Sequence, residues 1–591
     1  MLCAALLLAC AGVSAQGGAT PTGPSFALDV RAPAPVKALL ERHLELRRYR
    51  EVSDLDDAEL ARLVTLAERN VRELVGTLGY FNPRIAISRQ QASGHPVIVV
   101  DVTPGERTQV DKVAIGFAGD IQDNTSPDVE RQRATIRSGW TLPPRAPFTQ
   151  AAWDAAKAQA TRDLVARRYL NGHISASEAD IDAATGRAAL AVTLDSGPVF
   201  HLGGLKVNGV ERYDAVLVPR LARLPAGSEY DQDAILQAQL RLAGSGYFDS
   251  AFILVDPEAD PNAAPVQVTV REAALHKVVL GVGVSTDSGP RASIEYDNNR
   301  VPVIGWRAIN KLQLERKQPF ASTEWTAIPG EDGWRWGVLA RAERIDDGTL
   351  VTHAQRLRAG QSWLGDHIER NVYVQYDRAN VQAAPGVLAT IPDTGDGAAL
   401  SVNYVWAGKY FDSTPYPSRG YGVGAEFGGG YTLTGSRSPF QRTVLRWLGI
   451  RPLGDGRLQL RAQGGAVFAS SQARVPADQL FRTGGDTTVR GYGFREIGVE
   501  RGNVVGPGRY LAVGSVEYQK PFLWNGLPTA WESVLFVDGG AVSDRVVTLK
   551  PVFGTGVGAR WKSPLGPVEI DLAYGVQPKK LRLHFNLGFN F

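Results

Sequence analysis

The sequence predicts small α+β modules followed by an antiparallel transmembrane β-barrel of sixteen strands. Three observations carry this prediction. The composition changes sharply near residue 275, helix–glycine–strand units repeat before that point, and polar and apolar residues alternate for some 300 residues after it. A chain of 591 residues has room for several domains. Its hydrophobic fraction of 44% is sufficient for packed cores, so wholesale disorder is not expected.

Residues 1–15 are expected to be a cleavable export signal. Residues 4–13 form an apolar run too short to span a bilayer, and Val13-Ser14-Ala15 provides a small-residue cleavage site. Lipidation at Cys10 is an alternative, because Leu7-Leu8-Ala9-Cys10 resembles a lipobox. A buried N-terminal helix is the third interpretation. Residues 16–25 are interpreted as a linker rich in Gly, Thr and Pro.

Composition excludes several classes of function. Cys3 and Cys10 are the two cysteines, so catalytic cysteines, Cys metal clusters and a disulfide framework are excluded for the rest of the chain. The balance of 64 Lys+Arg against 61 Asp+Glu argues against nucleic-acid binding. The sequence contains no run of 18 consecutive apolar residues, so no transmembrane helix is predicted. No nucleophile, zinc or phosphate-loop motif is found, so no enzyme, cofactor or metal site is predicted.

A domain boundary is predicted near residue 275. Residues 26–275 carry 28 basic and 33 acidic side chains, net −5, and only two of the twelve Trp. Residues 276–591 carry 36 basic and 28 acidic side chains, net +8, and the other ten Trp. A shift of this size in both charge and aromatic content marks a boundary between domains of different character.

The first region repeats one unit three times. Helical patterns over 58–78, 151–170 and 231–244 each end near a glycine that opens a strand-like segment. The glycine anchors are Gly79-Tyr80-Phe81, Gly172-His173-Ile174 and Gly246-Tyr247-Phe248. Glycine is the expected residue where a helix must stop and reverse. The alternative is that these are three unrelated helix-to-strand turns that share a glycine.

The second region alternates polar and apolar residues with a period of two. In the last strand Leu581, Leu583, Phe585, Leu587, Phe589 and Phe591 face one way, and Lys580, Arg582, His584, Asn586 and Asn590 face the other. About sixteen such segments follow Val278, and they are rich in Tyr and Trp. An apolar outer face, a polar lumen and aromatic girdles are typical of transmembrane barrels. One or two secreted β-sandwiches are the alternative.

The longest interruption of the strand pattern, about 470–509, contains Val489, Arg490, Gly491 and Tyr492 in sequence. With this motif the chain resembles the BamA/TamA superfamily of outer-membrane assembly factors. Further segments are similar to family motifs in the same order: Ser515–Pro521 with Glu517, Phe536–Gly540 with Asp538 and Gly539, Gly556–Asp571, and the C-terminal Phe585–Phe591. The resemblance covers nearly the whole chain after the export signal.

The resemblance implies three POTRA modules and a barrel, over 26–107, 108–199, 200–273 and 276–591. Three modules resemble TamA most, because BamA-like members carry five. Two-partner secretion transporters are the alternative; they carry two modules and usually a plug helix, for which no segment is found. A passive porin is disfavoured because simple porins lack such modules.

The resemblance also implies a loop lock. The loop tip Val489, Arg490, Gly491 and Tyr492 would fold into the lumen, where Asp538 would pair with Arg490. Alternation independently places Asp538 on the inner face, where a buried carboxylate needs a cationic partner. A bidentate guanidinium–carboxylate pair is the expected geometry. Glu517 is a second partner or an ordinary lumenal charge, Gly539 and Asp571 belong to the barrel motifs, and a solvated loop cation is the alternative for Arg490.

The sequence and the resemblance together predict an outer-membrane insertase with periplasmic modules and a monomeric barrel. The first strand, Val278–Thr286, contains glycines and is expected to pair weakly with the last, His584–Phe591. The expected gate residues are Val279, Gly281 and Gly283 on the first strand, and Phe585, Gly588 and Phe591 on the last. Such a seam could accept a client strand by β-augmentation. The implied partners are unfolded outer-membrane proteins, outer-membrane lipid and a TamB-like inner-membrane protein.

Overall fold

The computed structural model describes residues 25–52, 55–92, 95–387, 394–413, 416–563 and 566–587. The expected export signal, nearly all of the linker and the gate residues Gly588 and Phe591 lie outside the described residues. The chain forms two compact units. The first comprises Met1–Lys206, Leu224–Ile235 and Leu254–Gln267, and the second comprises Val207–Arg223, Leu236–Ile253 and Val268–Phe591. No described helix is long and apolar enough to cross a membrane.

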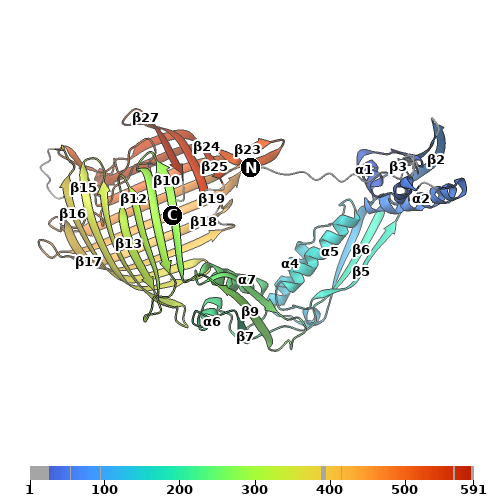
Figure 1. Ribbon diagram of the computed structural model, residues 1–591, viewed down its shortest axis with the longest axis horizontal. Helices are drawn as coiled ribbons and strands as arrows, with labels where there is room; N and C mark the ends of the chain where they lie inside the picture. The colour runs from blue at the N-terminus through green and yellow to red at the C-terminus, as the bar shows by residue number, and fades with distance from the viewer. Residues whose placement is uncertain are drawn as a thin grey trace, which may run out of the picture. The chain divides into compact units, whose positions relative to one another are not determined.

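Three small mixed sheets, each with helices, form the N-terminal region (Figure 1). Their strand orders are β1-β3-β2, β4-β6-β5 and β7-β9-β8, and we name the three folds modules 1, 2 and 3. In modules 1 and 2 the first strand runs parallel to the third and the second runs antiparallel to it. The elements of module 1 are β1 (Ala27–Arg31), α1 (Ala34–His43), η1 (Glu45–Glu51), α2 (Asp57–Thr77), β2 (Arg84–Ala92) and β3 (His95–Thr103).

Modules 2 and 3 follow the same order of elements. Module 2 contains β4 (Gln109–Ala118), α3 (Asp120–Asp123), α4 (Pro127–Ser138), α5 (Gln150–Val165), β5 (His173–Asp182) and β6 (Arg187–Asp195). Module 3 contains β7 (Leu202–Asn208), α6 (Leu217–Ala222), α7 (Gln232–Gly244), β8 (Phe248–Val255) and β9 (Ala264–Glu272). The sequence pattern missed α1, α4 and α6, which are 10, 12 and 6 residues long.

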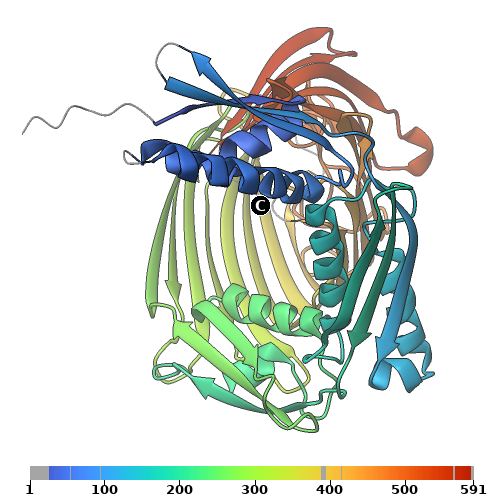
Figure 2. The same cartoon turned by 90° about the vertical axis from the view of Figure 1, so that its right-hand side faces the viewer.

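Helix α2 illustrates why these modules fold (Figure 2). Asp56 caps its N-terminus by accepting a hydrogen bond from the backbone N–H of Glu59. Its buried face packs on the sheet of module 1 and consists of Leu60, Leu63, Ala67, Val71 and Val75, which recur at helical spacing. The chain then reverses at Gly79, whose φ of 90° is readily adopted only by glycine.

The second predicted helix is shorter than its pattern. The sequence predicted it over 151–170, but α5 ends at Val165. The reason is tertiary: the carbonyl of Ala166 accepts from Gln232, and the N–H of Arg168 donates to the carbonyl of Tyr230. These bonds to the next module replace those that would continue the helix, and Arg168 takes a left-handed φ of 66°.

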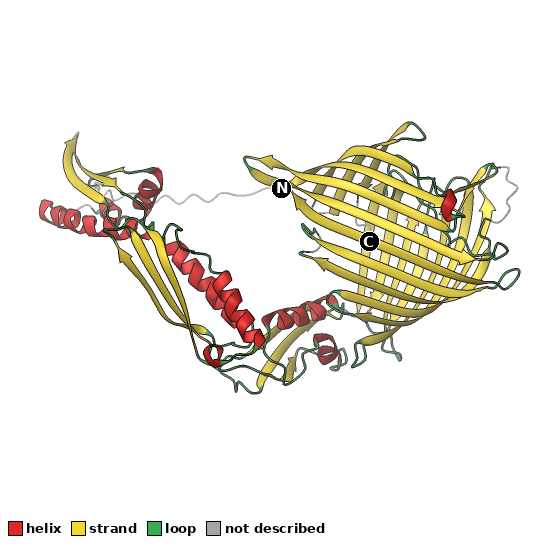
Figure 3. Ribbon diagram, turned by 180° about the vertical axis from the view of Figure 1, so that it is seen from behind, coloured by secondary structure: helices red, strands yellow, loops and turns green. Residues whose placement is uncertain are grey.

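The C-terminal region is a closed barrel of sixteen strands in chain order, which confirms the predicted fold class (Figure 3). The strands are β10 (His276–Ser285), β11 (Gly289–Asn298), β12 (Arg307–Glu315), β13 (Phe320–Thr326), β14 (Trp334–Asp346), β15 (Leu350–Leu364), β16 (Ile368–Ala383), β17 (Gly397–Phe411), β18 (Gly420–Thr432), β19 (Pro439–Leu453), β20 (Gly456–Ala469), β23 (Tyr510–Trp524), β24 (Leu527–Ser543), β25 (Val552–Ser563), β26 (Gly566–Gly575) and β27 (Lys580–Leu587). The long loop between β20 and β23 contains the two-stranded sheet of β21 (Val499–Arg501) and β22 (Val504–Gly506), and η2 (Val546–Thr548) lies between β24 and β25.

The barrel wall separates an apolar outer face from a polar inner face. On β27 the side chains of Leu581 and Leu583 are exposed outward, whereas those of His584 and Asn586 are buried inside. Adjacent strands repeat this division because side chains of a strand alternate between its two faces. The strands are 7 to 17 residues long.

Candidate functional site

The loop 470–509 brings its tip into a packed cluster on the inner face of the barrel. Val489 is completely buried and Tyr492 nearly so. Both belong to one apolar cluster with wall residues that include Val467, Leu511 and Val513. Burial of these side chains removes apolar surface from water and so stabilises the inward position of the loop.

Arg490 occupies the centre of this site. Its guanidinium donates to both carboxylate oxygens of Asp538, from Nε to Oδ2 at 2.7 Å and from Nη2 to Oδ1 at 3.0 Å. The backbone N–H of Arg490 also donates to Asp538 Oδ2, at 3.1 Å. The arginine is 4% exposed and the aspartate 0% exposed. This bidentate pair is therefore shielded from solvent, which strengthens its electrostatic attraction.

Two further carboxylates bind the same guanidinium. Arg490 Nη1 lies 2.7 Å from Glu517 Oε2 and 3.1 Å from Asp571 Oδ2. A second cation, Arg560, donates to both oxygens of Asp571 at 2.6 and 3.0 Å. Three carboxylates thus face two arginines in this cluster, and we call Arg490, Arg560, Glu517, Asp538 and Asp571 the lock cluster.

Neighbouring groups complete the coordination of the lock cluster. The hydroxyl of Ser515 donates to Asp538 Oδ1 at 2.7 Å, and the amide of Gln519 donates to Glu517 Oε1 at 2.6 Å. The guanidinium of Arg490 lies over the ring of Phe536, 3.4 Å from its centroid. Arg461 donates to the loop carbonyls of Thr487 and Thr488. The buried charges are therefore hydrogen-bonded as well as paired, which burial of charge requires.

Close backbone contacts hold the tip against strands β25 and β26. Gly491 has a φ of 91°, and a side chain there would collide with the backbone of Gly575. Gly554 lies directly against the carbonyl oxygen of Arg490, so no larger residue fits at that position of β25. The N–H of Gly491 donates to His584 Nε2 at 2.9 Å, which assigns the imidazole proton to Nδ1. Glycine thus serves here to permit close approach.

The structure brings some of the expected lock residues to the loop tip but not all of them. Arg490 contacts Asp538, Glu517 and Asp571, although the sequence had linked Asp571 only to a barrel motif. Gly539 faces the ring of Phe553 and does not contact the loop tip; its neighbour Gly540 packs against Val489 instead.

Sequence reasoning did not assign Arg560, Gly540 or Gly554 to the site, although Gly540 and Arg560 lie within the motif segments. Alternation could have placed Ser515 and Gln519 beside Glu517 on one inner face and Arg560 on the inner face of its own strand, but it could not show that Arg560 meets Asp571.

The seam between the first and last strands is the second candidate site. Within the described residues, β10 pairs with β27 at Val284↔Leu587 and Ser285↔Asn586. By contrast, β10 pairs with β11 along its whole length, from His276 to Ser285. Of the expected gate residues, Phe585 accepts a hydrogen bond from the N–H of Thr286 at 3.1 Å.

The outer face of the first strand is open to its surroundings. Leu280 and Val282 project outward from β10 and are 75% and 86% exposed, while Val279, on the opposite face of the strand, is 41% exposed. Gly283 is close to the carbonyl oxygen of Leu587, whereas Gly281 lies against Ser293 of β11. The seam therefore has described backbone pairing at one end of β10 only.

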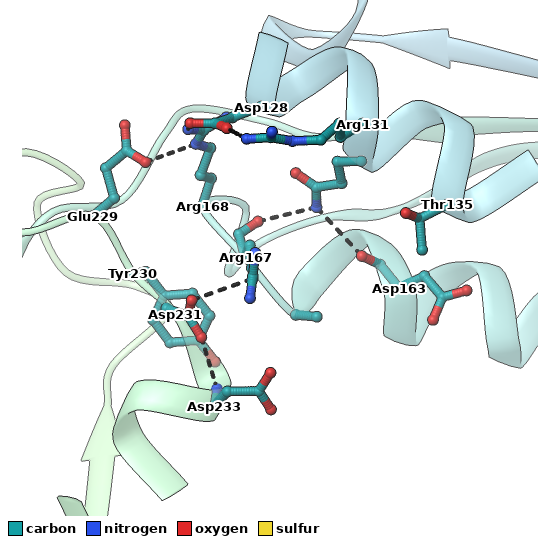
Figure 4. A pocket seen from close by; sticks show the side chains of 12 residues that line it. Asp128, Arg131, Thr135, Asp163, Arg167, Arg168, Glu229, Tyr230, Asp231 and Asp233 are labelled. Carbon is teal, nitrogen blue, oxygen red and sulfur yellow. Dashed lines mark hydrogen bonds and ion pairs between the residues drawn. The ribbon is translucent and has the colours of Figure 1, made fainter. Parts of the chain in front are cut away.

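A separate pocket of about 610 Å³ lies in the first compact unit (Figure 4). Arg168 crosses its rim and pairs with Glu229 at 2.7 Å and with Asp128 at 3.3 Å. Arg167 pairs with Asp231 at 3.2 Å. Arg131 pairs with Asp128, so all three arginines of the pocket are paired and it offers no unpaired cation to an anionic ligand. The described residues also contain no group of three His, Cys, Asp or Glu side chains that could hold a metal ion.

Two domain families match this chain. Residues 344–591 match the Omp85 superfamily domain, and residues 32–104 match the POTRA domain TamA domain 1. The outer membrane protein assembly factor BamA of Nitratidesulfovibrio vulgaris is 31% identical over 390 residues, which are 64% of this chain and 48% of that protein. The protein of the same name from Neorickettsia risticii is 22% identical over 423 residues, 66% of this chain and 54% of that one.

The chain spans about half the length of these curated relatives. Among solved structures, BamA from Haemophilus ducreyi lacking POTRA domains 1–3 superposes with a TM-score of 0.56 at 14% identity. The superposition covers 80% of this chain and 98% of that one. At this identity the similarity establishes the fold.

Proposed function

This chain is a member of the Omp85 superfamily with a TamA-type first POTRA domain, and from that premise we propose that it is an outer-membrane assembly factor. Its barrel is an outer-membrane barrel preceded by POTRA domains, as the sequence predicted. In this proposal the protein inserts and folds β-barrel or autotransporter clients. It does so by presenting a strand edge, without a chemical reaction.

The observation that carries the proposal is the seam between β10 and β27, where the described pairing comprises two residue pairs. Described pairs join these strands only at Val284 and Ser285 of β10, beside an exposed outer face. The backbone N–H and C=O groups along the edge of a strand are a template for another strand. An incoming client strand can add to β10 by β-augmentation, and its alternating side chains then continue the barrel pattern.

The lock cluster supports a defined resting state in this proposal. Arg490 holds the loop tip against β23, β24 and β26 through Glu517, Asp538 and Asp571. These strands are close to the seam in the barrel order. The loop therefore stabilises the wall beside the gate, where the described pairing of β10 with β27 is limited to two residue pairs.

The modules are the proposed receivers of clients and of a partner. Each is a small three-stranded sheet with open edge strands, which suits capture of extended chains. The match of residues 32–104 to the first TamA POTRA domain favours a TamB-like inner-membrane protein as that partner. In this arrangement the modules lie in the periplasm.

A disulfide across the seam tests the proposal. Val284 and Leu587 stand directly opposite each other, so cysteines at both positions can be bridged. The chain after residue 15 contains no cysteine, so no competing bridge forms in a chain cleaved there. Val374 and Val402, opposite each other on β16 and β17, provide a matched control pair away from the seam.

We expect oxidation of the Val284→Cys/Leu587→Cys variant to deplete β-barrel proteins from the outer-membrane proteome, and reduction to restore them. The control pair should have no effect when bridged to the same extent. An unchanged outer membrane with a fully bridged seam would contradict the proposal. Continued secretion of a single exoprotein in that state would favour a two-partner secretion transporter instead.

A further inference from the structure

The inward loop also contacts the first strand of the seam, through a ring of three hydrogen bonds. The hydroxyl of Ser285, at the end of β10, donates to Asp486 Oδ2 at 2.7 Å. The backbone N–H of Asp486 donates to Asp287 Oδ2 at 2.7 Å, and the N–H of Asp287 donates to Ser285 Oγ at 3.1 Å. Ser285 and Asp287 are both buried, so water does not readily replace these bonds.

The same loop contacts the last strand. Gly491 donates its N–H to the buried His584 of β27, at 2.9 Å. Glu496 forms an ion pair with Arg582 of β27 at 3.1 Å, and the N–H of Gly493 donates to Glu496. The ion pair is partly exposed and contributes little by itself, so the buried bond to His584 is the stronger anchor.

These contacts meet where the seam is paired. The described pairing of β10 and β27 lies at Val284 and Ser285, and Thr286 adds a bond to the carbonyl of Phe585. Ser285 thus belongs to both the seam and the ring. The next glycine of the loop, Gly485, lies so close to the carboxylate of Asp287 that a side chain there would collide with it. The loop therefore approaches the first strand as tightly as its backbone allows.

We propose that the loop 470–509 is a clasp that joins the two seam strands, with Asp486 as the residue that positions β10. Asp486 and Ser285 hold one side of the seam, and Gly491 with His584 holds the other. Breaking the Asp486 contacts separates β10 from the clasp while the lock cluster still holds the loop in the lumen. This assigns control of seam opening to Asp486, a role distinct from that of Arg490.

Charges around the ring are consistent with this role. Lys317 and Arg582 face Asp287, and His584 faces Asp486. Lys317 also lies over the ring of Phe494 in the loop, 5.4 Å from its centroid. Lys317 and Arg582 are therefore the cations that offset the negative charge of the two carboxylates, because His584 accepts the N–H of Gly491 as a neutral imidazole.

The clasp is tested by measuring the distance across the seam in the full chain. Spin labels at Val282 on β10 and Leu583 on β27 both project from the outer face, so they leave the ring intact. The labelled protein in lipid nanodiscs is compared with versions carrying Asp486→Ala, Ser285→Ala or Asp486→Asn. Glu500, an exposed carboxylate on β21 of the same loop, supplies the control Glu500→Ala.

We expect Asp486→Ala and Ser285→Ala to raise the population of a longer-distance state about tenfold, as for loss of one hydrogen bond to a charged group. Asp486→Asn keeps an acceptor oxygen for Ser285, so it should retain the wild-type distribution of distances across the seam. A general folding defect at this position would not allow that result. Glu500→Ala should have no effect. Unchanged distances in both alanine variants, with the barrel folded on gels, would overturn the clasp.

This inference rests on the proposed function only for the meaning of seam opening. A seam that widens in Asp486→Ala supports the clasp even if bridging Val284 to Leu587 leaves the outer-membrane proteome unchanged. That combination would reject the assembly function alone. The opposite combination, with depletion on bridging and no widening in Asp486→Ala, would reject the clasp alone.

Discussion

At the scale of single residues, Arg490 illustrates how charge is accommodated inside a barrel. Its guanidinium contacts Asp538, Glu517 and Asp571 and stacks on Phe536. Lysine could replace the charge but not this geometry, because an ammonium has no planar fork with several fixed donors. The residue therefore fixes both the position and the orientation of the loop tip.

We expect Arg490→Ala to destabilise the barrel by roughly 3–5 kcal/mol, because the buried carboxylate of Asp538 loses its partner. The measurement is the temperature at which the folded band converts to the unfolded band on gels. The conversion temperature of Arg490→Lys should lie between those of wild type and Arg490→Ala. A double-mutant cycle with Asp538→Ala should show strong coupling, and additive effects would contradict a direct pair.

Glu272 is a second residue with a defined electrostatic role, at the end of module 3. Burial by itself would raise its pKa, but the backbone N–H groups of Tyr213, Glu211 and Arg212 donate to its carboxylate and hold the pKa below its usual range. Because the folded pKa is lowered, the ionised group contributes stability above about pH 4.3. This contribution is lost as the pH falls through the folded pKa.

Replacing the charge should therefore loosen this turn at neutral pH. We expect Glu272→Gln to speed hydrogen exchange at the amides of Glu211, Arg212 and Tyr213 at pH 7. The free energy of local opening should fall by an amount on the order of 1 kcal/mol. The difference from wild type should shrink as the pH drops below the folded pKa. Glu258→Gln, at an exposed position of the same module, is the control. A difference that is constant with pH would contradict the electrostatic explanation.

At the scale of elements, the barrel strands are shaped by what approaches them. Strand β25 carries glycine at Gly554 because the carbonyl of Arg490 lies against it. Strand β24 carries Gly540 where Val489 packs. These glycines weaken strand propensity, but they admit the loop into the lumen. The helices of the modules, by contrast, carry large apolar side chains that pack into the module cores.

We expect Gly554→Ala to displace the loop tip, because the added methyl group would overlap the carbonyl oxygen of Arg490. The loop should then become accessible to protease in intact cells while the barrel remains folded on gels. Gly464→Ala on β20 is a matched control, because nothing lies near the added methyl group there. Equal protease resistance of both variants would contradict the close contact between β25 and the loop.

At the scale of the whole molecule, two different sources of stability occur in one chain. The modules have small apolar cores, which typically provide limited stability at this size. The barrel is a closed sheet in which backbone groups are paired along most strands. Charge differs as well, at net −5 over residues 26–275 and net +8 over 276–591.

We therefore expect unfolding in two steps. With increasing urea the helical circular dichroism of the modules should be lost first, while the barrel still migrates as a folded band on gels. The physical reason is that opening the closed barrel requires many strand pairs to break together. A single transition, in which the helical signal and the folded band disappear at the same urea concentration, would contradict independent stability of the two regions.

The sequence by itself determined the class of each region. Period-two alternation identified the inner and outer faces of β27, and helical periodicity identified α2, α5 and α7, because both patterns depend only on local backbone geometry. The resemblance supplied the lock motif, and alternation placed Asp538 on the inner face. The same local reasoning extended α5 past Val165, since it could not account for hydrogen bonds made by the next module.

Only the tertiary structure decided which residues meet. Asp486 and Ser285 are separated by 201 residues, and Arg490 and Asp571 by 81. Alternation with Ala559 and Trp561 indicates that Arg560 points into the lumen, but only the hairpin of β25 and β26 brings it to Asp571. Such contacts depend on barrel closure and on the path of the inward loop. Both are global properties of the fold, whereas periodicity reports only the faces of each strand.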